Sequence, residues 1–322
     1  MSYLEHYLKR FSKWFEDPAM VELAINPDRR IWILRRGDVS MKDTGETVDP
    51  GLSKALTDQI AGASHAQTGR EKLLVSATVT FKDRPIRTQS VVAPATAGEA
   101  ALSFRLFASL PIDEIELKYL HGKQVSLRHE RQERNKKLLA LAAAGDLMDA
   151  LRFCVEHRLN IVISGGTDTG KSVALRKLIS MIPDDERIVT IEDARELFPA
   201  QPNAVALLAD RAGTTRTTDM LLEATLRMRP DRLIVGEVRG KEAMTFLEAV
   251  NTGHGGSMTT IHAETPELAL DRLAIAAGRS DVPMSYGDLR NYVLRTIDVI
   301  IQTGRVGDTR GIAEIFIPEK AA

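Results

Sequence analysis

The sequence of 322 residues has a single cysteine, no long apolar run and a formal net charge of only -1. The lone Cys154 cannot form an internal disulfide, which excludes a disulfide-stapled fold and fits a reducing compartment. No stretch reaches the roughly 18 apolar residues of a membrane span, and the N-terminus lacks a secretory signal pattern, so we expect a cytoplasmic protein. The near-neutral charge and the lack of an aromatic-basic stripe argue against direct nucleic-acid binding.

The length suffices for two domains that each bury a core. Segments rich in β-branched residues predict an α+β N-terminal domain over residues 1–107, with strands at 30–34, 73–80 and 89–93. The apolar periodicity then lapses, and we predict a linker over residues 108–127. A charged run follows in which Glu130 and Arg134 have helical i,i+4 spacing, so we expect a solvated helix at the start of a second domain, residues 128–322.

The N-terminal segment has apolar residues at helical spacing, namely Leu4, Leu8, Phe11 and Phe15. We therefore predict an amphipathic helix whose apolar face packs on its own domain. Docking of this face on a membrane surface is the alternative.

The second domain contains the segment GGTDTGKS, which satisfies the phosphate-loop pattern G-x-x-x-x-G-K-[ST]. A predicted strand, 161–163, enters the loop and a predicted helix, 173–182, leaves it, which is the required strand-loop-helix context of an α/β fold. The glycines let backbone N–H groups and a helix N-terminus face phosphate, Lys171 would reach the β- and γ-phosphates, and Ser172 would supply a hydroxyl to Mg²⁺. The predicted ATP-contacting residues are Gly165, Gly166, Thr167, Asp168, Thr169, Gly170, Lys171, Ser172 and Val173.

Two further strands carry carboxylates at their C-terminal ends, where parallel sheets bind ligands. Glu192 follows the β-branched segment 187–191, and Glu237 follows 233–235. Either carboxylate could hold a water on Mg²⁺ or polarise the attacking water, and Glu237 is the leading candidate. A solvated salt bridge is the simpler interpretation of each one alone.

A glycine-rich turn lies between two histidines, His254 and His262. Their eight-residue spacing fits neither a zincin helix nor a zinc finger, although a metal site stays conceivable. Neutral imidazoles beside a γ-phosphate could instead sense it or orient groups around it.

Together, GGTDTGKS, IEDARELF, LRMRPDRLIVGEVRG and NTGHGGSMTTIHAET resemble the Walker A, Asp box, Walker B and His box of the secretion ATPases. The sequence is most similar to the VirB-type traffic ATPases of bacterial type IV secretion systems, clearly in the C-terminal half and only in pattern before it. The resemblance implies a RecA-like P-loop domain after a smaller α+β domain, and an ATPase at the cytoplasmic face of the inner membrane.

The resemblance also implies a homo-hexameric ring that works with inner-membrane secretion components and other secretion ATPases. ATP and Mg²⁺ would lie between the two domains of each subunit, and Arg87 and Arg105 would reach the phosphates from the N-terminal domain. Arg229, with its neighbour Arg227, is a further candidate near the nucleotide. Loss of the γ-phosphate would swing the N-terminal domain about residues 108–122.

The loop departs from the family where Asp168 and Thr169 replace small uncharged residues and where Val173 follows Ser172. A carboxylate near polyphosphate is unfavourable unless it points outward, so nucleotide affinity or turnover could be reduced. We therefore expect a hexameric motor that energises substrate translocation or pilus assembly in type IV secretion or conjugation. A nucleotide-gated scaffold with little hydrolysis, a type IV pilus-type motor and a nucleic-acid translocase are the alternatives.

Overall fold

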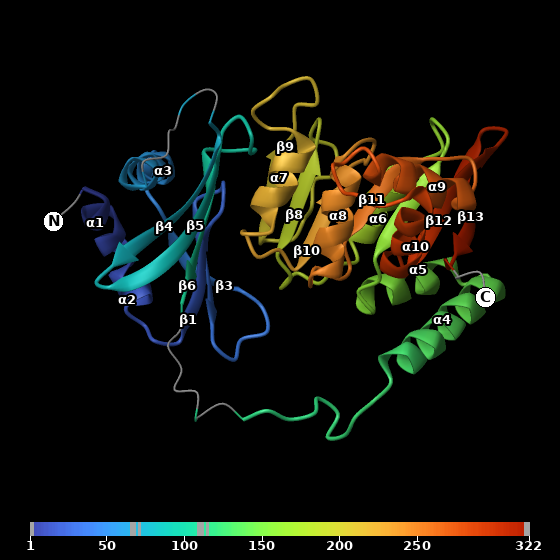
Figure 1. Ribbon diagram of the computed structural model, residues 1–322, viewed down its shortest axis with the longest axis horizontal. Helices are drawn as coiled ribbons and strands as arrows, with labels where there is room; N and C mark the ends of the chain where they lie inside the picture. The colour runs from blue at the N-terminus through green and yellow to red at the C-terminus, as the bar shows by residue number, and fades with distance from the viewer. Residues whose placement is uncertain (1–2, 65–68, 70–71, 108–112, 114–115, 319–322) are drawn as a thin grey trace.

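The computed structural model describes residues 3–64, 69, 72–107, 113 and 116–318. These residues form two sheets with separate helical layers (Figure 1). The N-terminal sheet is antiparallel, in the strand order β3-β2-β1-β6-β5-β4. Its strands are β1 Met20–Ile25, β2 Arg30–Arg35, β3 Lys42–Thr47, β4 Leu74–Phe81, β5 Arg84–Val92 and β6 Ala100–Leu106.

Helices cover one face of this sheet (Figure 1). They are α1 Tyr3–Leu8, the 3-10 turn η1 Lys9–Phe11, α2 Ser12–Phe15 and α3 Leu52–Ala63. The apolar residues predicted at helical spacing, Leu4, Leu8, Phe11 and Phe15, are all buried in the core of their own domain. This confirms the prediction that the face packs internally, and it leaves little apolar surface for membrane docking.

The C-terminal sheet is mostly parallel, in the order β13-β12-β7-β11-β10-β8-β9, with only β13 antiparallel. Its strands are β7 Ile161–Gly165, β8 Ile188–Glu192, β9 Ala204–Leu208, β10 Arg232–Val235, β11 Met258–His262, β12 Val299–Val306 and β13 Thr309–Phe316. Successive side chains of a strand point to opposite faces, so Ile161 and Ile163 join one core while Val162 joins another. Both faces must therefore be covered.

Two groups of helices provide that cover. One core is shared with α4 Leu127–Ala144, α5 Leu147–Glu156 and α6 Lys171–Ile179. The opposite core is shared with α7 Thr218–Thr225, α8 Glu242–Asn251, α9 Pro266–Ala277 and α10 Tyr286–Thr296. This architecture confirms the predicted α/β fold with a smaller α+β domain before it. None of the described helices combines the length and the apolar composition that a membrane span requires.

The N-terminal domain docks on the β9 edge of the C-terminal sheet (Figure 1). The Ala97 N–H donates to the Ala206 carbonyl at 3.0 Å, and the Leu208 N–H donates to the Ala95 carbonyl at 2.9 Å. β9 is four strands away from β7, which leads into the phosphate loop. At about 4.8 Å per strand, the docking edge is roughly 19 Å from the loop.

Candidate active site

The phosphate loop connects β7 to α6 and adopts the backbone that its glycines allow. Gly170 has φ +93°, and a Cβ on Gly165 would lie 2.1 Å from Thr303 Oγ1. A side chain at position 170 would be strained and one at 165 would clash, so both positions require glycine. α6 begins at Lys171, directly after the loop, so its N-terminus faces the same space as the loop amides.

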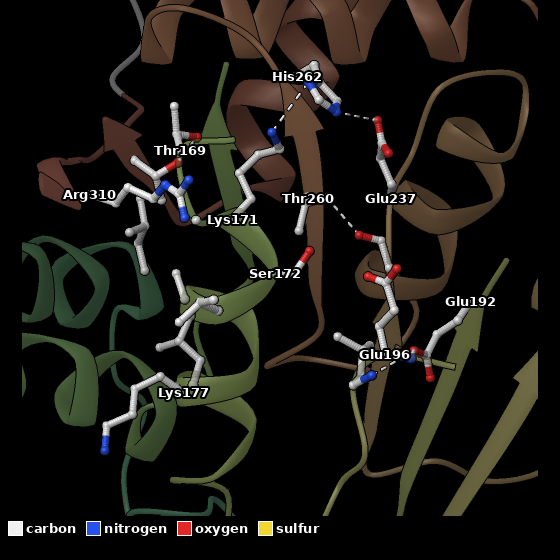
Figure 2. Close-up of a pocket in the computed structure, with 18 of the residues that line it drawn as sticks. Thr169, Lys171, Ser172, Lys177, Glu192, Glu196, Glu237, Thr260, His262 and Arg310 are labelled. Atoms are coloured by element: carbon white, nitrogen blue, oxygen red, sulfur yellow. Dashed lines mark hydrogen bonds and ion pairs between the residues drawn. The ribbon is translucent and has the colours of Figure 1, made fainter. Parts of the chain in front are cut away.

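Lys171, His262 and Glu237 form a chain of polar contacts across the carboxyl ends of three adjacent parallel strands (Figure 2). The Lys171 ammonium lies 3.3 Å from His262 Nδ1, and His262 Nε2 lies 3.4 Å from Glu237 Oε1. The ammonium also donates to the carbonyls of Gly165 and Gly166, at 3.1 and 2.6 Å. The lysine of the phosphate-loop pattern is thus connected to a carboxylate through one imidazole.

The protonation of this chain follows from its surroundings. Burial lowers the pKa of His262, against the opposing charge of Glu237, so the ring is neutral at neutral pH. An ammonium can only donate, so Nδ1 accepts from Lys171 and the ring proton is on Nε2, which lies 3.4 Å from Glu237 Oε1. Burial works to raise the pKa of Glu237, but the hydrogen bond and charge of Arg239 outweigh it and keep that pKa below its usual range. Glu237 is therefore an ionised acceptor.

Glu192, at the end of β8, has both of its carboxylate oxygens engaged in hydrogen bonds. Oε1 accepts from the Thr190 hydroxyl at 2.9 Å, and Oε2 accepts from the N–H groups of Glu196 and Leu197 at 2.8 Å. Glu192 is 4% exposed. This geometry suits a residue that fixes the loop after β8 better than one that accepts a proton from water.

A cavity of about 770 Å³ extends over the loop, which is within the usual size range of small-molecule sites. Asp168, Thr169, Gly170, Lys171, Ser172 and Val173 line it, whereas Gly165, Gly166 and Thr167 are absent from its lining. Glu237, Glu192 and His262 line the same cavity from the neighbouring strands. The Ser172 hydroxyl and the Glu237 carboxylate are oxygen donors of the kind that Mg²⁺ prefers.

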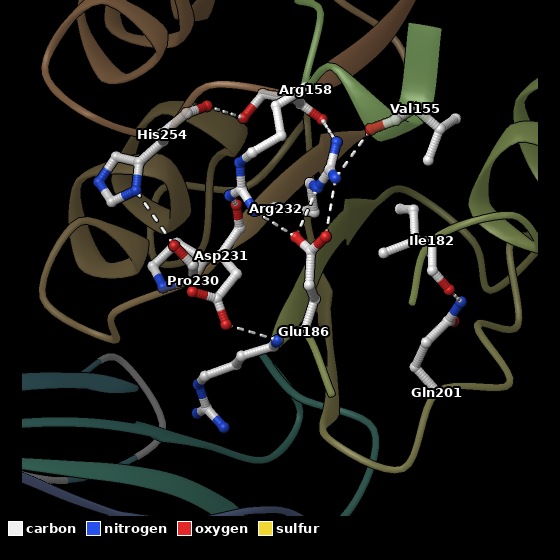
Figure 3. A network of polar contacts seen from close by, with 12 residues as sticks. Val155, Arg158, Ile182, Glu186, Gln201, Pro230, Asp231, Arg232 and His254 are labelled. Atoms are coloured by element: carbon white, nitrogen blue, oxygen red, sulfur yellow. Dashed lines mark hydrogen bonds and ion pairs between the residues drawn. The ribbon is translucent and has the colours of Figure 1, made fainter. Parts of the chain in front are cut away.

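Two residues predicted for the site lie at the amino ends of the parallel strands, whereas the phosphate loop lies at their carboxyl ends. Arg229 precedes β10 and His254 precedes β11, whereas Glu237 and His262 come at or after the ends of these strands. His254 Nδ1 contacts the Pro230 carbonyl at 3.2 Å, beside a network built on Arg232 and Glu186 (Figure 3). The length of a strand therefore separates them from the loop, and His254 and His262 cannot share one metal ion. Among the described residues, no cluster of three or more metal-ligating side chains is present.

The predicted arginines of the N-terminal domain also lie away from the cavity. Arg87 and Arg105 are cross-strand neighbours on β5 and β6, and both are exposed. Every described residue that lines the cavity lies at or after Leu147. The chain's own N-terminal domain thus does not bring these arginines to its own phosphate loop.

The structure adds residues that the sequence did not indicate. Arg310 and Thr303 from β13 and β12 line the cavity, and Thr303 Oγ1 lies 2.7 Å from Thr169 Oγ1. Arg211 bridges the loops after β8 and β10 through Asp193 and the Glu237 carbonyl. No local pattern marks these residues, because each is distant in sequence from the groups that it contacts.

Comparison with known proteins identifies relatives over most of the chain. The sequence profile of the family described as Type II/IV secretion system protein matches residues 70–302. The conjugal transfer protein TrbB of Rhizobium radiobacter is 32% identical, over 94% of this chain and 84% of that protein. The type IV secretion system protein VirB11 of Bartonella henselae is 31% identical, over 96% of this chain and 91% of that protein.

A solved structure shares the fold. The crystal structure of the VirB11 ATPase from the Brucella suis type IV secretion system, in complex with sulphate, superposes with a TM-score of 0.84. It is 27% identical in sequence, and the superposition covers 98% of this chain and 94% of that one.

Proposed function

We propose that this chain is a motor, and the proposal starts from its family. The chain belongs to the type II/IV secretion system protein family and is a secretion ATPase of the VirB11 and TrbB kind. The motor would be a homo-hexameric ring that hydrolyses ATP to energise substrate translocation or pilus assembly in a type IV secretion or conjugation system. The observation that carries this proposal is the contact chain from Lys171 through His262 to Glu237 beside the phosphate loop.

In this proposal Glu237 is the group that positions the attacking water. Its ionised carboxylate can accept a hydrogen bond from water, and the bond from Arg239 fixes its orientation. Lys171 would neutralise charge on the β- and γ-phosphates. His262 would couple the position of Lys171 to that of Glu237, because its ring contacts both side chains. Glu192 would keep the neighbouring loop in place.

The cofactor in this proposal is Mg²⁺, held by the Ser172 hydroxyl and, through water, by Glu237. When bound, it supplies positive charge to the phosphate oxygens. The cavity volume and the oxygen donors fit a nucleotide with its metal ion, and the loop amides fit phosphate.

Arg87 and Arg105 would act on the nucleotide of a neighbouring subunit in the ring. Support comes from their exposure, from their adjacent positions on one sheet face, and from their separation from their own loop. A guanidinium supplied in trans can contact phosphate in bidentate fashion. Arg229 and His254 contribute no contact to the nucleotide cavity of their own subunit.

The proposed partners are inner-membrane components of the secretion system and its other ATPases. The protein would lie peripherally at the cytoplasmic face of the inner membrane, held by these partners. The buried apolar face of α1 to α2 makes protein contacts the better explanation of that placement than insertion of this segment into lipid.

The experiment is Mg²⁺-dependent ATP turnover against protein concentration, with assembly size followed by light scattering. We expect turnover per subunit to rise with assembly, and Lys171→Ala and Glu237→Gln each to lower it by about 10²- to 10³-fold. Lys54→Ala, which removes a 64% exposed lysine, is the matched control and should turn over as the native chain does.

The outcomes separate the alternatives. Full turnover by monomers would contradict the ring. Tight ATP binding by assembled rings without turnover would contradict the motor and support the nucleotide-gated scaffold.

A further inference from the structure

Two unusual residues of the phosphate loop, Asp168 and Thr169, both contact the β12–β13 hairpin. The Asp168 carboxylate forms an ion pair with the Arg310 guanidinium and lies 3.6 Å from that of Arg305. Thr169 Oγ1 lies 2.7 Å from Thr303 Oγ1, which in turn donates to the Ser164 carbonyl at 2.9 Å. The hairpin is thus connected to the loop at two adjacent positions.

The ion pair has an electrostatic reason within the hairpin. Arg305 and Arg310 are direct cross-strand partners, and like charges at such positions destabilise a strand pair. Asp168 supplies a negative charge to both guanidinium groups, and Asp308 supplies a second one to Arg305 at 3.2 Å. The carboxylate that would repel polyphosphate is therefore neutralised by a residue that also lines the cavity.

The cavity has two chemically different ends, with Lys171 between them (Figure 2). Glu237 and His262 lie at one end, to which the Lys171 ammonium points. Arg310 lies on the other side of Lys171 (Figure 2). Apolar side chains of α5 and β13 also line the cavity, namely Leu147, Met148, Leu151 and Ile312.

The lining of this cavity suits a nucleoside triphosphate, which has a charged γ-phosphate at one end and an aromatic base with apolar ring faces at the other. The γ-phosphate belongs beside Lys171, His262 and Glu237. The base then belongs against the apolar side chains, and the α-phosphate and ribose pass Arg310.

We propose that Arg310 binds the α-phosphate end of the nucleotide and that Asp168 is the residue that positions it. This inference rests on the proposed function, since it assumes that the cavity takes ATP. Asp168 then promotes nucleotide binding although its charge is negative, because without it Arg310 is not held beside the loop. Arg305 shares the ion pair but does not line the cavity, so it makes no contact with nucleotide.

The test measures dissociation constants of Mg-ATP and Mg-ADP by displacement of a fluorescent nucleotide, on the full-length chain. We expect Arg310→Ala to weaken both nucleotides by the same factor, about 10- to 100-fold, because a charge-assisted bond to the α-phosphate is common to both. We expect Asp168→Ala to weaken both as well, by about 3- to 10-fold, and Asp168→Glu to restore most of the loss.

The double variant Asp168→Ala with Arg310→Ala should bind more tightly than Arg310→Ala alone, because the single variant leaves an unpaired carboxylate near polyphosphate. Arg305→Ala is the comparator and should change either constant less than about 3-fold. Melting temperatures without nucleotide check that the variants fold, since exposed ion pairs contribute little to stability.

Three results would overturn the inference. Tighter ATP binding by Asp168→Ala would show a merely repulsive carboxylate, and native affinity in Arg310→Ala would show a surface ion pair. Loss of ATP affinity alone, with ADP affinity kept, would place Arg310 at the γ-phosphate. If the native chain bound no nucleotide, the proposed function itself would fail, whereas an unaffected Arg310→Ala in an active native background fails this inference only.

Discussion

Glu22 shows how burial changes the chemistry of one residue. It lies on β1, is only 2% exposed, and faces the positive charges of Arg229, Arg187 and Arg105. Burial raises the pKa of Glu22 to about 7, although the three arginines act in the opposite direction. The folded protein thus holds a proton on Glu22 at pH values where an unfolded chain, with a pKa of 4.5, has lost it.

The sign of the pH dependence follows from that difference. The folded pKa is above the unfolded one, so the stabilisation from the bound proton is complete below pH 4.5 and is lost as the pH rises to about 7. We expect the native chain to lose about 3 kcal/mol of unfolding free energy between pH 4.5 and 7 through this group. Glu22→Gln should abolish that part of the pH dependence.

Urea denaturation at several pH values measures this effect, followed by tryptophan fluorescence. Both tryptophans of the chain, Trp14 and Trp32, belong to the N-terminal domain and report on it alone. The exposed Glu46, changed to Gln, is the control and should keep the native slope. An unchanged slope in Glu22→Gln would show that Glu22 is ionised throughout.

At the scale of elements, an aromatic cluster attaches the N-terminal helices to the first sheet. Phe11 lies 6.2 Å from Phe104 and 5.7 Å from Phe15 between ring centroids, and Phe15 lies 5.8 Å from Phe81. These four side chains are among the largest fully buried ones in the described chain. The short helices, of three to six residues each, are too short to be stable alone, so this packing must hold them in place.

We expect Phe11→Ala to lower the unfolding free energy of the N-terminal domain by about 3–5 kcal/mol, because it leaves a cavity where a fully buried ring was. Chemical denaturation followed by tryptophan fluorescence measures the change. Tyr3→Ala, at an 82% exposed position of the neighbouring helix α1, should change it by less than about 0.5 kcal/mol. Equal effects of the two variants would contradict the packing argument.

At the scale of the whole molecule, the two domains are joined by buried polar contacts beside the β9 edge. Asn203 Oδ1 accepts hydrogen bonds from the Arg187 guanidinium and from the Asn26 side-chain amide, the latter at 2.9 Å. Asn26 Oδ1 in turn accepts a hydrogen bond from Arg187 at 2.8 Å. Arg187 is fully buried, and that burial lowers its pKa to about 10. A buried guanidinium needs its acceptors, so these contacts favour the docked arrangement of the domains.

We expect Asn203→Ala to weaken docking by about 1–3 kcal/mol, because Arg187 and Asn26 each lose a buried acceptor. Hydrogen exchange at the interdomain amides of Ala97 and Leu208 should then become about 10- to 100-fold faster. Asn251→Ala, at an exposed position away from the interface, is the control. Unchanged exchange in Asn203→Ala would show that the strand edge and apolar contacts hold the domains together.

The swing of the N-terminal domain that the family resemblance implies would use the same interface. Most of residues 108–115, within the predicted hinge at 108–122, lies outside the described residues. The same two amides can report on the motion, since a domain that leaves the β9 edge on losing the γ-phosphate must expose them.

Much of the candidate active site is predictable from the sequence because the information that defines it is local. A phosphate loop is defined by eight consecutive residues between a strand and a helix, so near-neighbour backbone geometry determines it. The predicted strands place Glu237 and Glu192 at the carboxyl ends of the parallel strands, and both residues line the cavity. The predicted helix after residue 127 and the packing of Leu4 to Phe15 also depend on short-range periodicity.

Only the tertiary structure decided which distant residues meet. The partners of Asp168 and Thr169 lie 142 and 134 residues away, on a hairpin that the sequence pattern did not indicate. The sequence places Arg229 and His254 near the phosphates, but the direction of the strands puts them at the amino ends of β10 and β11, away from the loop. The docking of the N-terminal domain on β9 keeps Arg87 and Arg105 away from the phosphate loop of their own chain. Strand order and domain docking depend on the whole core, because a local pattern fixes what an element is but not which element lies beside it.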